Sequence, residues 1–239
     1  MEGGDELAAR AVVAASGTFG RPHRPTLPGL EGFTGTVLHA AEYRSTAPFA
    51  GQRIVVVGAG NSAVQIAVEL ATVARVTLAG RHPVKFAPQQ ILGRDLHFWL
   101  RRTGLDTAPL GRLLSTPPAQ PVIDDGRYRA ALGVGMPDRC AMFTGIDGSK
   151  VTWAEGTVEE VDTILLATGY RPDQPYLTGL RALDDAGHPR HRDGLSPVHP
   201  GVAFVGLEWQ RSLSSDSLRG VGRDAARFAR RLSAHLTRR

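Results

Sequence analysis

The residues best suited to chemistry are the small ones in "GQRIVVVGAGNSAVQIAVEL", residues 51–70. Gly58, Gly60 and Ala63 follow a run of β-branched residues in the spacing G-x-G-x-x-A, and a helix with an apolar face follows them. Gly58 permits a tight turn, Gly60 lets backbone approach a pyrophosphate, and Ala63 allows close packing of helix on strand. The free N–H groups of the helix N-terminus would face the phosphates. We predict a nucleotide site here; the alternative is a Rossmann-like packing motif that binds no phosphate.

The end of the next strand indicates which nucleotide would bind. The segment "ARVTLAG" reads as a strand and ends at Gly80, and Arg81 and His82 come next. NAD sites usually place an acidic residue here to hold the ribose 2′-hydroxyl, whereas an arginine accommodates a 2′-phosphate. Arg81, helped by His82, would bind that phosphate through charge-assisted hydrogen bonds. We therefore predict NADP rather than NAD.

The composition narrows the class of protein. A chain of 239 residues can bury a sizeable core, and no apolar run reaches the roughly 18 residues that span a bilayer. The beginning, "MEGGDELAAR", is acidic with no apolar region behind it, so we expect a cytoplasmic protein without a leader. The single cysteine, Cys140, fits a reducing compartment. The eight histidines show no spacing typical of a metal site.

The basic charge does not point to nucleic acid. The net charge is +5, but the arginines are spread along the whole chain with no stripe of interleaved aromatics. Only the segment "RDAARFARRLSAHLTRR" at the end is dense in arginine. Its apolar residues Ala226, Ala229 and Leu232 approximate a helical period, with Phe228 off that face, so we expect an amphipathic helix.

Two further apolar strands each end in a small residue, a hydroxyl residue and a glycine. "VDTILLATGYRPD" exits through Thr168 and Gly169, and "ARAVVAASGTFGRP" exits through Ser16 and Gly17, each after a small residue. A tight turn would explain one such ending. Two of them on either side of a Rossmann unit suggest that the chain leaves one domain after Gly17, builds a nucleotide domain, and returns after Gly169.

Together these motifs resemble the flavin-containing monooxygenase superfamily. "FTGTVLHAAEY", which by itself reads as a strand edge running into a turn, matches the fingerprint F-x-G-x-x-x-H-x-x-x-W through Phe33, Gly35 and His39, with Tyr43 in place of tryptophan. The nearest group is the bacterial FAD/NADP-dependent oxidoreductases, related to Baeyer–Villiger and N-hydroxylating monooxygenases. The resemblance implies that His39 is the catalytic residue, acting in domain movement and NADP positioning.

The resemblance also implies a reaction. NADPH held at the glycine turn, with Asn61 and Ser62, would pass hydride to FAD, and the reduced flavin would capture O2 as a C4a-peroxide that oxygenates a small organic substrate. The segment "SLRGVGRDAARFA" resembles the helix whose N-terminus points at the flavin, with Gly220 and Gly222 allowing close approach. The substrate pocket near the flavin is not readable from this sequence.

The resemblance predicts an α/β protein in which a Rossmann-type NADP-binding domain is inserted in the incomplete remnant of an FAD-binding domain. We expect a remnant with linker at 1–39, the NADP domain at 40–170 and the rest of the FAD domain at 171–239. The glycine motif for the FAD pyrophosphate is absent from this sequence. A truncated chain, a partner chain or homo-oligomer that covers the FAD domain, and an NADP-binding module working alone are all open. A disulfide reductase would need a second cysteine.

Overall fold

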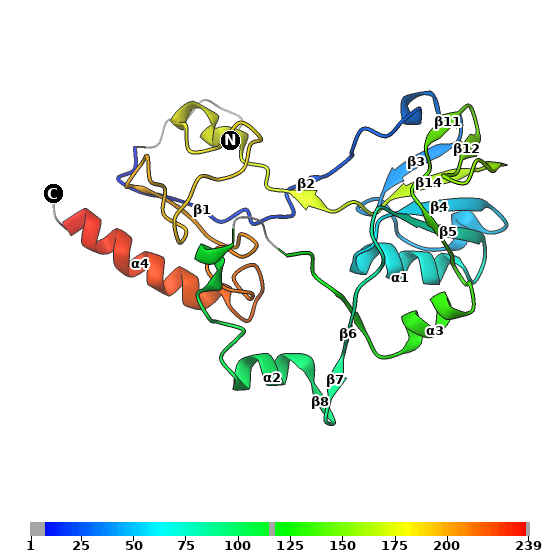
Figure 1. The fold of residues 1–239 in the computed structure, drawn as a ribbon. Helices are drawn as coiled ribbons and strands as arrows, with labels where there is room; N and C mark the ends of the chain where they lie inside the picture. Colours follow the sequence, from blue (N-terminus) through cyan, green and yellow to red (C-terminus); the bar gives the residue numbers. More distant parts are fainter. Residues whose placement is uncertain (1–7, 115–117, 238–239) are drawn as a thin grey trace. The chain divides into compact units, whose positions relative to one another are not determined.

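The computed structural model describes residues 8–114 and 118–237 and forms two compact units (Figure 1). The sheet unit comprises residues 22–96 and 118–169. The described part of the terminal unit comprises residues 8–21, 97–114 and 170–237. The first seven residues, on which the expectation of no leader rests, lie outside the described residues.

A five-stranded parallel sheet forms the centre of the sheet unit. Its strands lie in the order β10-β5-β4-β14-β3, and every neighbouring pair is parallel. The strands are β3 (Thr36–His39), β4 (Arg53–Val57), β5 (Arg75–Gly80), β10 (Asp138–Ala141) and β14 (Thr163–Leu166). The α/β class is therefore confirmed. The order reverses between β4 and β14, and open α/β sheets bind ligands outside the carboxyl ends of their strands at such a point.

Both faces of the sheet are covered, which explains the continuous apolar run in β4. Ile54 and Val56 face one hydrophobic cluster, and Val55 and Val57 face a second cluster on the other side. All four are buried. A parallel strand buried on both faces has no polar alternation, because neither side meets water.

Two helices cover the first face. They are α1 (Asn61–Leu70) and α3 (Arg127–Gly133), which contact each other (Figure 1). Ala63, Ala67 and Leu70 of α1 are fully buried against the sheet. These side chains recur at helical spacing, so one stripe of α1 faces the core and the helix is held by packing.

A small antiparallel sheet covers the other face. It consists of β11 (Gly145–Asp147), β12 (Lys150–Thr152) and β13 (Val158–Glu160). Phe143 and Trp153 extend its apolar side into the second cluster, and their rings meet edge to face with centroids 6.4 Å apart.

Arg53 and Glu159 join this small sheet to the parallel one. Arg53 Nε donates to Glu159 Oε2 at 2.9 Å, and its Nη2 donates to Thr77 Oγ1 at 2.7 Å. Trp153 Nε1 donates to Glu159 Oε1 at 2.8 Å. Burial raises the pKa of Glu159, but hydrogen bonds from Arg53 and Trp153, with the charges of Arg53 and Arg75, outweigh it and hold the pKa below its ordinary value.

The unit boundaries differ from those expected from the sequence. Residues 22–39, which we assigned to the remnant and linker, lie in the sheet unit because β3 pairs with β14. Leu27 is buried in the second cluster, and a Cβ at Gly29 would overlap the backbone of Ile146. Residues 97–114 belong instead to the terminal unit, although they fall within the expected 40–170 domain.

Shorter elements connect these parts. Within the sheet unit, β6 (Phe86–Pro88) pairs in parallel with β9 (Val122–Asp124), and β7 (Gln90–Ile91) forms a hairpin with β8 (Arg94–Asp95). Further short elements are β2 (Arg21–Pro22), β15 (Tyr170–Arg171), α2 (Leu96–Arg102), η1 (Leu30–Gly32), η2 (Ala47–Phe49), η3 (Leu110–Leu113) and η4 (Pro175–Leu180).

The terminal unit contains a two-stranded parallel sheet and a long helix. The strands are β1 (Val12–Ala14) and β16 (Val202–Phe204), and the helix is α4 (Val221–Thr237). The expected terminal helix is confirmed, but its expected apolar face is wrong. Asp224, Phe228 and Leu232 are buried, whereas Ala226 and Ala229 are exposed.

A buried ion pair explains why the helix turns this face inward. Asp224 accepts hydrogen bonds from Arg211 Nε and Ser215 Oγ, both at 2.6 Å. This pairing compensates the burial of the carboxylate, and Phe228 and Leu232 follow it at intervals of four residues.

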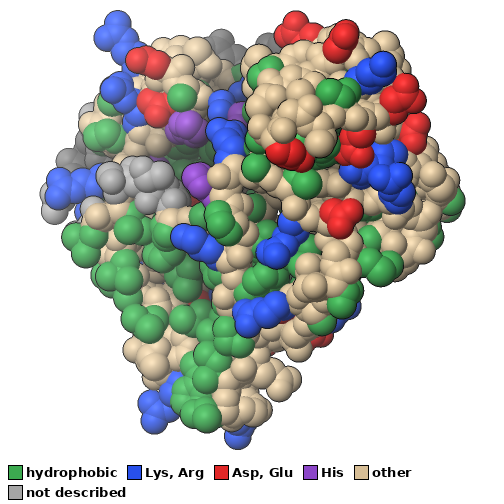
Figure 2. Space-filling view, turned by 45° about the vertical axis from the view of Figure 1, so that its right-hand side comes forward, with side chains coloured by type: hydrophobic (Ala, Val, Ile, Leu, Met, Phe, Trp, Pro, Cys, Tyr) green, Lys and Arg blue, Asp and Glu red, His purple; other side chains and the backbone are tan. Residues whose placement is uncertain are grey.

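The surface agrees with the dispersed arginines of the sequence. On the face shown in Figure 2, basic side chains stand in separate groups among other residue types. None of the helices in the described residues is long and apolar enough to cross a membrane.

The carboxylate of Glu159 offers a test of the join between the two sheets. Glu159→Gln should lower the free energy of unfolding by about 1–3 kcal/mol at pH 7, because the half-buried Arg53 loses its counter-charge. The folded pKa of Glu159 is below its unfolded pKa of 4.5. Its carboxylate therefore stabilises the folded protein at pH values above 4.5, and this stabilisation is lost as the pH falls through the folded pKa. Denaturant unfolding from pH 7 to pH 3.5 should therefore show a flatter dependence for the variant.

The control is Glu160→Gln, an exposed neighbour on the same strand. Its effect should stay within about 0.5 kcal/mol. Equal effects of the two substitutions would contradict a specific role for Glu159.

Candidate functional site at the carboxyl ends of the parallel strands

The turn after β4 depends on a residue without a side chain. Gly58 has φ +147°, and a Cβ there would overlap the carbonyl oxygen of Ala167 at the end of β14 and lie 3.0 Å from the Cβ of Ala63. Its N–H donates to Ala79 O at 2.9 Å. The tight turn and the close packing at Ala63 predicted from the glycine motif are therefore confirmed.

Gly60 differs from Gly58 because it faces open space. It stands at the N-cap of α1 with φ −92° and ψ −172°, and no atom lies within 4 Å of the position of a Cβ. No side chain caps this helix end, and the first turn carries no acidic residue. Gly60 and Ser62 are both exposed. The first N–H groups of α1 are thus free of side-chain caps, as a bound phosphate would need.

The side chain of Asn61 is engaged within the sheet unit, so the predicted cofactor contact of this residue stays a prediction. Its Oδ1 accepts a hydrogen bond from Ile123 N at 3.1 Å, and its Nδ2 donates to Pro121 O at 3.3 Å. Both ends of the amide are therefore used to hold β9 against the start of α1. The side chain serves to position the helix, which leaves the backbone N–H as the group that could meet a phosphate.

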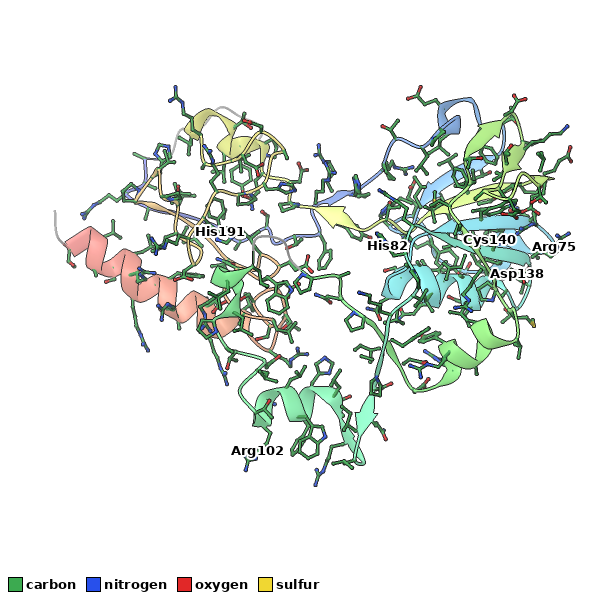
Figure 3. The ribbon with its side chains drawn as sticks, viewed as in Figure 1. Arg75, His82, Arg102, Asp138, Cys140 and His191 are labelled. Atoms are coloured by element: carbon green, nitrogen blue, oxygen red, sulfur yellow. The ribbon has the colours of Figure 1, made fainter. Side chains whose placement is uncertain are left out.

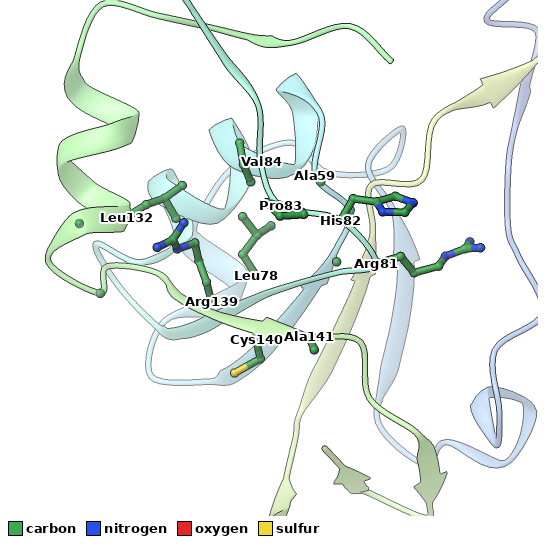
Figure 4. A pocket seen from close by; sticks show the side chains of 14 residues that line it. Ala59, Leu78, Arg81, His82, Pro83, Val84, Leu132, Arg139, Cys140 and Ala141 are labelled. Carbon is green, nitrogen blue, oxygen red and sulfur yellow. The ribbon is translucent and has the colours of Figure 1, made fainter. Parts of the chain in front are cut away.

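A cavity of about 560 Å³ opens beside this turn (Figure 4). Its lining has an apolar part, which includes Leu78, Val84 and Leu132, and a basic part formed by Arg81, His82 and Arg139. None of the described residues that line it is acidic. A cavity with cations and no carboxylate favours an anionic ligand over a neutral one.

The basic side chains of the cavity are not engaged elsewhere. Within residues 8–114 and 118–237, neither Arg81, His82 nor Arg139 has a hydrogen-bond or ion-pair partner. Arg81 and His82 follow the carboxyl end of β5, and Arg75 begins the same strand on the opposite side of the unit (Figure 3). Arg81 therefore follows the carboxyl end of β5, the place at which a 2′-phosphate was expected to bind, and its guanidinium is unpaired.

His39 is buried at the end of β3, with both ring nitrogens in use. Ala41 N donates to Nδ1 at 3.1 Å, so the proton is on Nε2, which donates to Gly169 O at 3.1 Å. Burial lowers the pKa of His39 further than its bond to Gly169 raises it, and the imidazole is held neutral. This arrangement supports a positioning role; the catalytic role that the resemblance implies stays a prediction.

Thr168 and Gly169 meet His23, where the chain enters the sheet unit. His23 N donates to Gly169 O at 2.9 Å, and Thr168 Oγ1 donates to His23 O. Gly169 adopts φ +81°, a conformation that favours glycine. These two predicted cofactor residues, together with His39, therefore hold the first entry of the chain into the sheet unit beside its last exit.

The other predicted cofactor residues lie in the terminal unit. Gly17 follows β1 with φ +69° beside the backbone of Gly206, and Ser16 Oγ accepts from Gln174 Nε2 at 3.1 Å. A Cβ at Gly220 would overlap Ser214, so the chain itself requires this glycine. Gly222 faces open space.

The described residues of the terminal unit provide no glycine turn for the FAD pyrophosphate. In its described residues, neither β1 nor β16 passes through a glycine turn into an α-helix as β4 passes into α1. The residues present therefore fit NADP in the sheet unit and do not fit the pyrophosphate of FAD.

Sequence reasoning missed Arg139, Leu132 and the Arg53–Glu159 pair. Arg139 lies in the segment "DRCA" of β10, which has no apolar pattern typical of a strand. Its place beside β5 comes from a long-range pairing in which Arg139 stands opposite Leu78. The remaining signal was an arginine next to Cys140 with no acidic residue after it for several positions.

A strand, a glycine turn and a helix that lead to a second parallel strand, beside a basic cavity, define a Rossmann-type dinucleotide-binding fold. Residues 3–101 match the family model described as pyridine nucleotide-disulphide oxidoreductase. The structure is similar to the flavin-containing monooxygenase from Stenotrophomonas maltophilia, with a TM-score of 0.78, 29% sequence identity, and coverage of 95% of this chain and 63% of that one.

Sequence relatives agree with the structural match. The CzcO-like oxidoreductase of Geobacillus kaustophilus is 31% identical over 223 residues, which are 91% of this chain and 63% of the relative. Indole-3-pyruvate monooxygenase YUCCA1 of Oryza sativa is 29% identical over 91% of this chain and 62% of its own length. The chain thus spans less than two thirds of these relatives. The resemblance to the flavin-containing monooxygenase superfamily is confirmed.

The two glycines of the turn should separate folding from binding. Gly58→Ala should lower the free energy of unfolding by more than about 3 kcal/mol, because a Cβ overlaps Ala167 at a positive φ. Gly60→Ala should change stability by less than about 1 kcal/mol, since its φ suits any residue and its Cβ has room. Thermal unfolding and NADP calorimetry on both variants make the comparison.

Gly60→Ala should nonetheless weaken NADP binding by roughly tenfold or more, because the added methyl group occupies the side from which phosphate would approach. Unchanged NADP affinity in a stable Gly60→Ala protein would show that the phosphate does not bind at this turn.

His39 should make stability depend on pH. Its folded pKa is below the unfolded value of 6.5, so the unfolded chain binds more protons as the pH falls through 6.5, and stability is lost toward acid pH. The slope from this group cannot exceed about 1.4 kcal/mol per pH unit. His39→Asn should cost about 1–3 kcal/mol at pH 7 and reduce this slope in denaturant unfolding between pH 7.5 and 5.5.

The half-buried His191 of the terminal unit also has a pKa that burial lowers, so His191→Asn is the matched control. This substitution should also reduce the slope of unfolding free energy against pH. It should leave the sheet unit unchanged, because His191 lies in the terminal unit. An unchanged slope in the His39 variant would mean that the pKa of His39 is the same in the folded and the unfolded chain.

Proposed function

We propose that the sheet unit binds NADP(H). The observation that carries the proposal is the cavity beside the Gly58 turn, which is lined by unpaired Arg81 and His82 and by no acidic residue. The adenosine 2′-phosphate would lie at Arg81 and His82, and the pyrophosphate would lie at Gly60 and the first N–H groups of α1.

The residues of this chain bind and orient the nucleotide. When bound, NADPH supplies a hydride from its nicotinamide ring. Asn61 fixes the start of α1 against β9, and Ala63 sets the distance between helix and strand, so the phosphate-binding N–H groups are placed before the ligand arrives. His39 holds the ends of β3 and β14 together as a neutral donor.

The wider activity we propose is that of an NADPH- and FAD-dependent oxidoreductase or monooxygenase that uses O2 on a small organic substrate. The support comes from relatives of that kind, such as the monooxygenases of Stenotrophomonas maltophilia and Oryza sativa. Because the described residues lack a pyrophosphate cradle for FAD, a flavin would need groups beyond them, from a partner chain, a second copy or a longer form of the protein.

A second candidate function is an NADP-binding module that works without flavin. It is favoured by the described residues of the terminal unit, which provide no glycine turn for the pyrophosphate of FAD. Val12 and Val13 of β1 are 45% and 48% exposed. Successive side chains of a strand point to opposite faces, so β1 meets solvent on both of its faces, whereas its partner strand β16 is buried. A flavin site built on β1 would require these faces to be covered.

The first experiment incubates the chain with excess FAD, desalts it, and records the visible spectrum while NADP and NAD are titrated by calorimetry. We expect NADP to bind more tightly than NAD. Arg81→Ala should weaken NADP by roughly 10- to 100-fold and leave NAD nearly unchanged, because a charged hydrogen bond to the 2′-phosphate is lost.

The outcomes separate the candidates. Retained flavin absorbance with NADP binding supports the flavin-dependent enzyme, and NADP binding without retained flavin supports the NADP-binding module. If neither nucleotide binds, or if Arg81→Ala weakens NAD and NADP equally, the proposed 2′-phosphate site is overturned. Arg75→Ala, at the other end of β5, controls for the loss of one positive charge.

A further inference from the structure

Arg139 is the second unpaired guanidinium of the cavity. It lies on the edge strand β10, opposite Leu78 of β5, and its side chain is exposed. An exposed arginine normally points into solvent, but this one lines the same cavity as Arg81. Its charge is not needed for any ion pair among the residues that the structure describes.

The two arginines serve different parts of the cavity. Arg81 and Arg139 extend to opposite sides of the pocket, and Arg139 reaches the side where Leu132 lies (Figure 4). Leu78 and Leu132 are buried there, and Val84 is half-buried. This side therefore combines an apolar surface with one planar cation.

The chemistry of this side suits a purine base. A purine is flat and has apolar faces, so one face can rest on aliphatic side chains while a guanidinium stacks on the other. A phosphate would gain nothing from contact with Leu78, Val84 and Leu132. A 2′-phosphate held by Arg81 leaves the base as the part of the nucleotide that can reach Arg139.

We propose that Arg139 determines nucleotide affinity by stacking on the adenine base, which lies over Leu78, Val84 and Leu132. The inference rests on the proposed binding of NADP by the sheet unit. It assigns the two arginines separate tasks: Arg81 distinguishes NADP from NAD, and Arg139 holds the base that both nucleotides share.

The test uses calorimetry with the full chain and two probes, 2′,5′-ADP and 5′-ADP, which share adenine but differ in the 2′-phosphate. Arg139→Ala should weaken both probes by the same factor, roughly 3- to 30-fold, as expected for the loss of a cation–π contact. Arg139→Lys should restore little of the affinity, because an ammonium group keeps the charge without the plane. Arg75→Ala, on the far side of the unit, is the matched charge control (Figure 3).

Each outcome decides the inference. Loss of 2′,5′-ADP alone in Arg139→Ala, or full rescue by Arg139→Lys, would make Arg139 a phosphate contact and overturn the stacking role. If the wild-type chain binds both probes and Arg139→Ala does not change either affinity, this inference is overturned and the proposed function stands. Failure of the wild-type chain to bind either probe would overturn both. Circular dichroism on each variant shows whether the fold is retained.

Discussion

The sheet unit depends on the space left by the missing side chain of Gly58. At that point the end of β4, the start of α1 and the end of β14 come within van der Waals distance, because Ala63 and Ala167 lie where a Cβ would be. The close approach places the N-terminus of α1 at the reversal of strand order, where α/β sheets bind ligands. A bulkier residue would separate helix from strand and remove the place for the phosphate. The same contact therefore determines both packing and binding.

Arginine has two opposite uses in this unit. Arg53 is half-buried at the amino ends of the strands, and Glu159 and Thr77 satisfy its donors. Arg81 and Arg139, at or near the carboxyl ends, have no partner within the described part of the chain. A satisfied guanidinium holds two sheets together, whereas an unsatisfied one beside a cavity keeps its donors for a ligand. The same residue type thus stabilises one end of the sheet and leaves the other end ready to bind.

Local patterns predicted the parts of this fold that are local in origin. The β4 run, the G-x-G-x-x-A turn and α1 were readable because their periodicity and small residues follow each other within one stretch of chain. The side-chain hydrogen bonds of Asn61 could not be predicted, because its partners Pro121 and Ile123 are distant in sequence. Phe228 was misplaced because a buried ion pair at Asp224, rather than apolar periodicity, orients α4. Arg139 needed the pairing of β10 with β5.

The hydrogen bonds between His23, Thr168 and Gly169 join the beginning of the sheet unit to its end. The backbone at His23, where the chain first enters the unit, is hydrogen-bonded to the backbone at Gly169, where the chain finally leaves it. His39 bonds to the same Gly169 carbonyl. A module whose two ends meet can be carried inside another protein without stretching its host, because the host sees only a short gap. The chain also leaves the sheet unit after Leu96 and returns to it at Pro118, so a transfer of this unit to another host would have to join that second pair of ends as well.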